Sequence, residues 1–255
     1  MIAFIEYMKL QGLSLNTMAA YMATIRMFLA RHDPDLATPM DVRNFIYGMS
    51  PPSRRRHWAA LKAFYRRRPY NPVSDIPIPP ATIPRIHVPS VTEASLIIES
   101  VTDPRNRLIL ELLYGSGFRV GALIQIRISD VDLSNRWIVL RDKGARQHVK
   151  PFGAKAAQWM GRYLSERRSH SDLLFPGLTD RTVRRIIANA CDRVGLPRIG
   201  PHSFRHAFAA HVRKNGADIV ELKNLLGHRR IESTERYLAI TPVTLSESLK
   251  KHPRK

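Results

Sequence analysis

The sequence predicts a mainly α-helical protein of two domains, with a small β-hairpin in the second. Apolar residues recur at the spacing of amphipathic helices through most of the 255 residues. Prolines crowd residues 69–89 and divide the chain, because each proline fixes φ and removes a hydrogen-bond donor. Two short runs, 137–140 and 148–152, flank a turn and predict the two strands of the hairpin.

The first domain, residues 1–70, is predicted to contain four helices. Apolar residues at helical spacing indicate the first two, over 2–10 and 15–30. Pro39 begins the third helix, because proline suits the first helical position. The fourth helix is expected to follow Ser53 as its N-cap.

Arginine clusters bracket this fourth helix. They form either a solvated helix face or a set of phosphate contacts, and the basic balance of the whole chain favours phosphate. Each phosphate neutralised is expected to steepen the salt dependence of binding by roughly 0.9 in log–log slope. The six residues are Arg54, Arg55, Arg56, Arg66, Arg67 and Arg68.

Residues 71–89 are predicted to form an extended, semi-rigid linker, since prolines at this density exclude both a helix and a central strand. A ligand for a proline-binding domain is the alternative interpretation of the same composition. Two domains joined by such a strap are able to close around a long partner as a clamp.

The second domain, residues 90–240, begins with a capping box formed by Ser90 and Glu93. A later helix ends at the Gly-Ser-Gly turn, residues 115–117. Arg119 follows this turn at the mouth of another apolar helix. By position alone, this arginine is an ordinary surface charge.

The hairpin turn, residues 142–146, contains Lys143 and Arg146. A lysine in a turn is ordinarily just exposed to solvent. Two helices are predicted after the hairpin, over 154–167 and 182–194. Arginines at the start of the second of these helices either contact nucleic acid or form a solvated face: Arg181, Arg184 and Arg185.

Residues 201–237 contain the densest set of candidate catalytic side chains. His202 and Arg205 are three apart on one predicted helix, so they present donors to the same side. Nine residues separate His228 from Tyr237, and a turn is required to bring these two together. A guanidinium fork, two imidazoles and a phenol at one place suit a phosphate attacked by a tyrosine oxygen.

Composition limits the classes of partner. A formal net charge of +20 favours nucleic acid first and an anionic membrane surface second. No apolar stretch approaches the roughly 20 residues of a membrane span, and no signal peptide is evident. The only cysteine, Cys191, falls in the apolar register of a helix, so no disulfide is expected. The sequence has neither zinc-ligand spacing nor a glycine-rich phosphate loop, so we expect no metal or cofactor. A single cysteine fits a reducing interior, and we expect a cytoplasmic, nucleoid-associated protein.

These motifs resemble those of one family. HSFRH, LLGH and the tyrosine nine residues after that histidine resemble the second signature block of the tyrosine recombinases of the Xer and phage-integrase type. LLYGSGFRVGALIQIRISDVDL resembles the first block, with Arg119 as its catalytic arginine, and IVLRDKGARQHVKPF resembles the hairpin with the catalytic lysine, Lys143. GLSLNTMAAYMATIRMFLA resembles the opening of the helical, SAM-like core-binding domain. The resemblance covers essentially the whole chain.

The resemblance implies site-specific recombination of double-stranded DNA. Two protomers bind each site, four assemble on two duplexes, and strands exchange through 3′-phosphotyrosyl intermediates and a four-way junction, for integration, excision or dimer resolution. The two domains form a clamp around the DNA. No metal or nucleotide takes part, and no membrane is involved.

Each candidate has a role in this chemistry. Arg119 and Arg205 stabilise the charge on the non-bridging oxygens, and Tyr237 is the nucleophile. The remaining groups handle protons or donate hydrogen bonds: Lys143 as general acid (Lys150 is the second choice), His202 as base and His228 as a donor to the phosphate.

One departure from the family pattern concerns position 122, where the family has an acidic residue and this chain has Ala122. We expect slower chemistry, or a substitute carboxylate from Glu111 or Asp130. Two alternative functions remain: a type IB topoisomerase-like relaxase and a catalytically silent DNA-binding regulator. The resemblance implies that the tail, residues 241–255, packs on a neighbouring protomer. The alternative is that the tail packs on its own domain.

Overall fold

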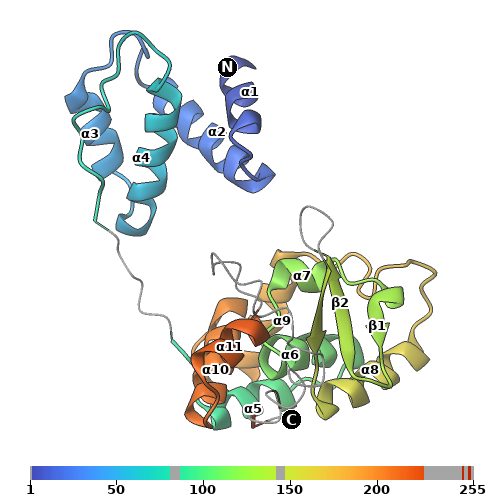
Figure 1. Ribbon diagram of the computed structural model, residues 1–255. Helices are drawn as coiled ribbons and strands as arrows, with labels where there is room; N and C mark the ends of the chain where they lie inside the picture. The colour runs from blue at the N-terminus through green and yellow to red at the C-terminus, as the bar shows by residue number, and fades with distance from the viewer. Residues whose placement is uncertain (1, 81–86, 142–146, 227–248, 250–251, 254–255) are drawn as a thin grey trace. The chain divides into compact units, whose positions relative to one another are not determined.

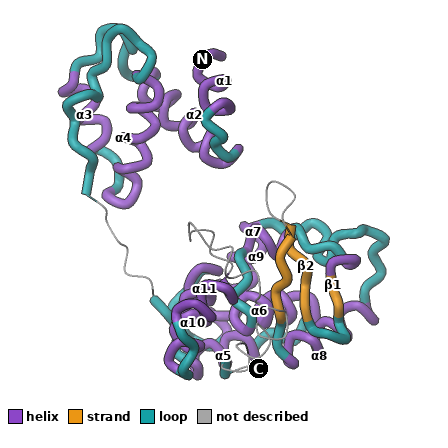
Figure 2. The backbone as a smooth tube through the Cα atoms, in the orientation of Figure 1, coloured by secondary structure: helices purple, strands orange, loops and turns teal. Residues whose placement is uncertain are grey.

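The computed structural model describes residues 2–80, 87–141, 147–226, 249 and 252–253. The chain divides into two compact units, Met1–Arg85 and Ile86–Lys255. Helices dominate both units, and the second contains a three-stranded antiparallel sheet (Figure 1; Figure 2). The predicted fold class, mainly helical with a small sheet, is confirmed. Within the described ranges, none of the helices combines the length and the apolar character that a bilayer span requires.

The helices of the first unit lie close to the predicted ranges. Ser14 caps the second helix, since its hydroxyl accepts from the backbone N–H of Thr17. Thr38 and Asp41 form a reciprocal capping box at the third. The bounds are α1 (Ile2–Leu10), α2 (Leu15–Leu29), α3 (Pro39–Tyr47) and α4 (Pro51–Tyr65).

The start of α4 corrects one prediction. The helix begins at Pro51, with Ser50 as its N-cap, so Ser53 lies inside the first turn and does not cap the helix. Two prolines, Pro51 and Pro52, occupy positions where a free N–H is not needed and where a φ near −65° is already helical. The Ser53 hydroxyl instead donates to the carbonyl oxygen of Ser50.

The core of the first unit extends beyond its helices. Phe28 meets Tyr65 edge-on, with ring centroids 6.4 Å apart. Val73 and Ile76, which the sequence places in the linker, are buried in this core. The indole N–H of Trp58 donates to the carbonyl oxygen of Ile76 at 3.0 Å. The beginning of the proline-rich segment is therefore part of the first unit.

The second unit packs its helices around α6 (Pro104–Gly115), which is buried from Arg107 to its end. Helix α6 contacts both α8 and α10, and the sheet has the order β1-β2-β3. Strand β1 and the short 3₁₀ helix before it were not predicted. The other elements are α5 (Val91–Glu99), α7 (Val120–Ile124), η1 (Ile128–Asp130), β1 (Val131–Asp132), β2 (Trp137–Arg141), β3 (Gln147–Pro151), α8 (Ala154–Glu166), α9 (Asp180–Arg193), α10 (Pro201–Lys214) and α11 (Ile219–Leu226).

Several local predictions for this unit hold. Ser90 and Glu93 form the expected capping box at α5. Helix α6 begins after Asp103, whose carboxylate accepts from the backbone N–H of Asn106. Cys191 is fully buried among apolar side chains of α9, as its register predicts.

The described part of the tail packs on its own domain. Leu249 is only 4% exposed and belongs to a small apolar cluster with residues of α10 and α11. The ring of His252 lies 4.5 Å from that of Tyr114 and 5.1 Å from that of Phe208, centroid to centroid. In this single chain these tail residues therefore follow the alternative of packing in cis.

A buried histidine predicts a pH-dependent stability for the first unit. His57 of α4 is 4% exposed, and its Nδ1 lies 3.0 Å from the hydroxyl of Thr24. That hydroxyl already donates to the carbonyl oxygen of Ala20, so it accepts from an Nδ1–H. Burial, together with the neighbouring Arg56, lowers the pKa of His57 below its usual 6.5.

The first unit should therefore lose stability as the pH falls below about 6.5, because the unfolded histidine takes up its proton before the folded one does. The loss is bounded by about 1.4 kcal/mol for each unit by which folding lowers the pKa. Thermal unfolding of wild type and His57→Gln between pH 7.5 and 5.5 measures the effect. The melting temperature of wild type should fall further over this range than that of the variant. Equal falls would refute the assignment of the effect to His57.

Candidate active site

A cleft of about 410 Å³ in the second unit brings together side chains from α7, α10 and β3. Three of the six predicted catalytic residues line it: Arg119, His202 and Arg205. No aspartate or glutamate is among the described residues of its wall. The other wall residues are Val120, Gly121, Ala122, Gln125, Leu140, His148, Lys150 and Leu226.

Arg205 is held by two backbone carbonyl groups. Its side chain is buried on α10, with only 9% of the residue exposed. One guanidinium nitrogen donates to the carbonyl oxygen of Gly117 at 2.5 Å, and another donates to that of Leu226 at 2.6 Å. Burial and the nearby Arg119 lower the pKa of Arg205 to about 10. A bound anion would favour the charged guanidinium and so offset both effects, which makes the site suited to negative charge.

Arg119 reaches the cleft because of the turn that precedes it. It is the N-cap of α7, directly after Gly117 and Phe118. Gly117 has a φ of +61°, a left-handed conformation that glycine adopts without strain. A Cβ at this position would also lie 2.5 Å from the Phe208 ring. The glycine thus serves both arginines: its conformation directs Arg119, and its carbonyl oxygen holds Arg205.

His202 and Arg205 line the same cleft, as their three-residue spacing predicts. They differ in depth, since His202 is exposed while Arg205 is buried. Pro201 occupies the first turn of α10, so both side chains project near the start of this helix. His148 of β3, which was not predicted, lies in the wall as a second imidazole.

Three predicted catalytic residues, Lys143, His228 and Tyr237, lie outside the described residues, as does Arg146. Lys150, the second choice to Lys143, is described and lies in the cleft wall. It is 5% exposed, and its ammonium group donates to the carbonyl oxygen of Leu225.

The carboxylates suggested as substitutes for the missing acid lie elsewhere. Ala122 is half-buried in the cleft wall. Glu111 accepts from the Nε of Arg107 at 3.1 Å on α6. Asp130 accepts from the backbone N–H of Arg127 and so closes the turn of η1. Backbone carbonyl oxygens accept from two cations of the wall: those of Gly117 and Leu226 from Arg205, and that of Leu225 from Lys150.

The six predicted arginines of the first unit divide into two groups. Arg54 donates to the carbonyl oxygens of Met49 and Tyr47, and Arg68 forms an ion pair with Asp35 at 2.6 Å. These two arginines therefore help to hold loops of their own unit. The remaining four, Arg55, Arg56, Arg66 and Arg67, are exposed.

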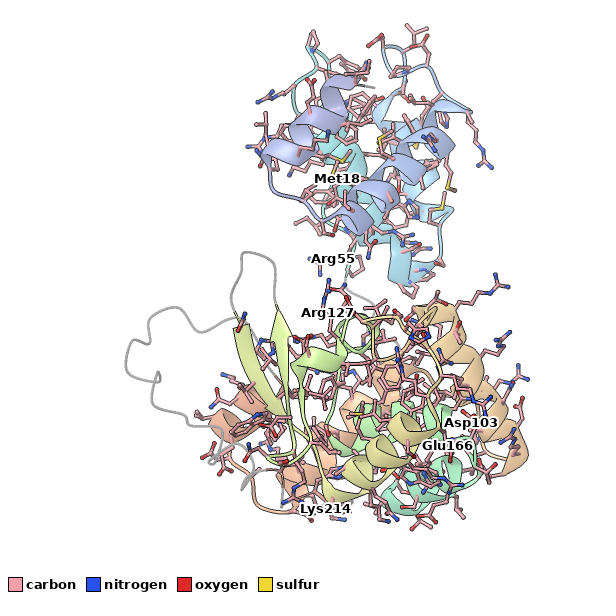
Figure 3. The ribbon with its side chains drawn as sticks, turned by 90° about the vertical axis from the view of Figure 1, so that its right-hand side faces the viewer. Met18, Arg55, Asp103, Arg127, Glu166 and Lys214 are labelled. Atoms are coloured by element: carbon pink, nitrogen blue, oxygen red, sulfur yellow. The ribbon has the colours of Figure 1, made fainter. Side chains whose placement is uncertain are left out.

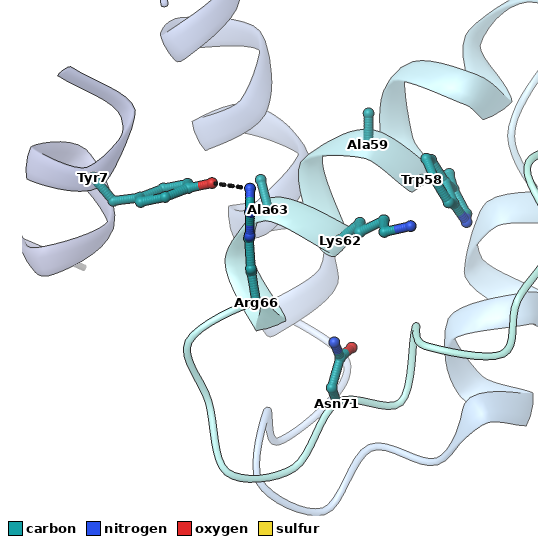
Figure 4. A pocket seen from close by; sticks show the side chains of 7 residues that line it. All are labelled: Tyr7, Trp58, Ala59, Lys62, Ala63, Arg66 and Asn71. Carbon is teal, nitrogen blue, oxygen red and sulfur yellow. Dashed lines mark hydrogen bonds between the residues drawn. The ribbon is translucent and has the colours of Figure 1, made fainter. Parts of the chain in front are cut away.

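A basic face on α4 includes Lys62, which was not predicted as a DNA contact. The side chain of Arg55 points away from the core of its unit (Figure 3). Further along the helix, Lys62 lies over the Trp58 ring, with Nζ 4.6 Å from the ring centroid. Arg66 donates to the hydroxyl of Tyr7 at 3.3 Å. The side chains of Tyr7, Trp58, Lys62 and Arg66 line a cavity of about 480 Å³ together with two alanines and Asn71 (Figure 4). The spacing of Trp58, Lys62 and Arg66 by fours was the available signal.

The arginines of α9 are all exposed. Arg184 forms an ion pair with Asp180, one helical turn earlier, at 2.5 Å. Arg181 and Arg185 are the other two predicted arginines of this helix. Among the described residues, no three His, Cys, Asp or Glu side chains are grouped so as to hold a metal ion.

The chain matches the phage integrase family over residues 90–242 and the N-terminal SAM-like domain of phage integrases over residues 1–75. It is 30% identical to the tyrosine recombinase XerC of Thermodesulfovibrio yellowstonii, over 98% of this chain and 95% of the relative. It is 29% identical to the tyrosine recombinase XerD of Listeria innocua, over 96% and 95%.

Solved structures agree with this relationship. The XerA recombinase is 28% identical, with a TM-score of 0.52 over 99% of this chain and 97% of that one. A λ integrase dimer bound to a core site has the same fold, at 19% identity and a TM-score of 0.72 over 92% and 97%. The chain belongs to the phage integrase family, and it is a site-specific tyrosine recombinase. These relationships favour recombination over a relaxase or a silent regulator.

The Gly117 turn gives a direct test of how the cleft is built. Gly117→Ala should lower the free energy of unfolding by more than about 2 kcal/mol, because a left-handed alanine costs about 1–3 kcal/mol and its methyl group overlaps the Phe208 ring. Urea unfolding measures the change.

Gly161→Ala is the matched control, since Gly161 lies in α8 with open space at its Cβ position. It should keep or raise stability, by up to about 1 kcal/mol. A Gly117→Ala protein as stable as wild type would show that the turn does not need glycine.

Proposed function

We propose that this recombinase cleaves and rejoins double-stranded DNA through a 3′-phosphotyrosyl link to Tyr237. The observation that carries the proposal is the cleft where Arg119, His202 and Arg205 meet. The pentavalent transition state bears extra negative charge on its non-bridging oxygens. Two guanidinium forks match that charge in sign and geometry, which makes a phosphodiester the best-fitting substrate.

The remaining roles are assigned by chemistry and family resemblance. The phenol oxygen of Tyr237 attacks phosphorus, and the bond to the 5′ oxygen breaks. Lys143 gives the leaving oxygen its proton, and His202 accepts the phenol proton. His228 donates a hydrogen bond to the phosphate. One phosphoester replaces another, so religation runs the same steps in reverse without a nucleotide.

The first unit is proposed to contact the duplex through α4. Its exposed cations, Arg55, Lys62 and Arg66, flank the small side chains of Ala59 and Ala63, which permit close approach of a backbone. A net charge of +20 supports binding to a polyanion. Together the two units would hold the duplex as a clamp, with Arg181, Arg184 and Arg185 of α9 as further phosphate contacts.

The assembled state is proposed to contain two protomers per site and four on two duplexes. Strands would then be exchanged in pairs through a four-way junction, for integration, excision or dimer resolution. The λ integrase neighbour was solved as a dimer on DNA, which supports pairing on a site. In this assembly the tail would leave its own domain for a neighbouring protomer. With DNA as substrate, the protein would work in the cytoplasm, at the nucleoid.

A nicked suicide duplex tests the reaction. Binding sites are first selected from a library of random duplexes, and the chosen site is then nicked near its centre so that the cleaved end diffuses away. Wild type should accumulate a covalent adduct at a 3′ phosphate. Tyr237→Phe should bind the same duplex with equal affinity and form no adduct, because no other group makes the link.

The other outcomes contradict the proposal in different ways. Binding by wild type without an adduct would identify a silent regulator. An adduct in wild type together with relaxed plasmid, but without recombinant products from paired sites, would identify a relaxase. An adduct that survives in Tyr237→Phe would reassign the nucleophile.

A further inference from the structure

We infer that Lys150 is a positioning residue of the active site, which fixes the C-terminal end of α11 against the cleft. It does so through a hydrogen bond from its buried ammonium group to the carbonyl oxygen of Leu225. The segment that follows α11 begins at residue 227 and carries His228. The consequence for cleavage rests on the proposed function, whereas the consequence for the helix end does not.

The geometry places two cations on consecutive carbonyl groups. Lys150 donates to the oxygen of Leu225, and Arg205 donates to that of Leu226. These are the last two residues of α11, whose final carbonyl groups have no partner within the helix. The negative end of the helix dipole lies at the same place and favours cations there. Lys150 and Arg205 therefore act together as a clamp on this helix end.

A purely structural role does not explain a lysine at this position. Lys150 of β3 pairs with Ile138 of β2, which is fully buried, so an apolar side chain suits the environment. Its Nζ lies 5.2 Å from the centroid of the Phe118 ring. Burying an ammonium group costs several kcal/mol, and replacing buried charges by apolar groups is often neutral or stabilising.

The surroundings of Lys150 are strongly positive. Arg119 and Arg205 face it from the start of α7 and from α10, and His148 and His202 line the same cleft. Burial first, then Arg205 and Arg119, hold the pKa of Lys150 well below its usual value. The ammonium form is therefore lost at lower pH than for an exposed lysine. Because a charged donor makes the stronger hydrogen bond, the clamp weakens as the pH rises.

Lys150→Met tests the assignment, since methionine keeps most of the apolar stem and removes the donor. Single-turnover adduct formation on the suicide duplex should slow by about 10- to 100-fold, as expected when catalytic groups are displaced by about 1 Å. The affinity for the duplex and the melting temperature should not fall. Any fall of the wild-type rate at alkaline pH should be smaller in the variant, and the part that comes from loss of the Lys143 proton should remain.

Lys155→Met is the matched control, because Lys155 is an exposed lysine at the start of α8, 3.9 Å from Glu99. It should cleave at the rate of wild type with the same pH profile. Hydrogen exchange over residues 219–237, without DNA, provides a readout independent of cleavage. Exchange should be faster in Lys150→Met than in wild type and unchanged in Lys155→Met.

The outcomes separate this inference from the proposed function. An inactive wild type would refute the proposed function, while the exchange measurement would still test the clamp. If Lys150→Met cleaves and exchanges at the rates of wild type, the clamp is overturned and the proposed function is not. A slower Lys150→Met that also melts earlier and keeps the wild-type pH profile would show a merely structural role, and that result also overturns it.

Discussion

The organisation of the cleft depends on backbone carbonyl oxygens that hold closely spaced positive charges. Arg205 donates to the oxygens of Gly117 and Leu226, and Lys150 donates to that of Leu225. A carboxylate would neutralise such a cation, whereas a carbonyl group orients it and leaves its full charge available to a phosphate. The positions of the cations are consequently set by backbone geometry: the left-handed turn at Gly117 and the last turn of α11.

Much of the fold follows from local sequence signals. Caps such as Ser14 and Ser90, together with helical periodicity, place most helix boundaries within a few residues. One error, the N-cap of α4, is local, because Ser50 precedes the two prolines that begin the helix. The other errors arise where distant packing decides the outcome. Val73 and Ile76 belong to a proline-rich segment that has no regular structure of its own, and only their contacts with the helical core bury them. The two-residue strand β1 exists because β2 pairs with it, which no local pattern indicates.

The candidate site shows the same division. The motifs and the three-residue spacing lead to Arg119, His202 and Arg205, and the structure places all three on one cleft. The environment of Lys150 was not predictable, because it depends on a strand register and on a helix end 75 residues away in the sequence. Ala122 could be recognised as unusual from the motif. That carbonyl oxygens accept from the neighbouring cations became evident only once the helices were packed.

The contact between Trp58 and Ile76 also defines the C-terminal boundary of the first unit when it is expressed as a separate fragment. A fragment cut at residue 70 would lose the buried side chains of Val73 and Ile76 and the acceptor of the indole N–H. It would expose apolar surface of the core and leave the indole N–H of Trp58 without its hydrogen bond. An expression boundary for this unit therefore belongs after residue 76, within the run of prolines.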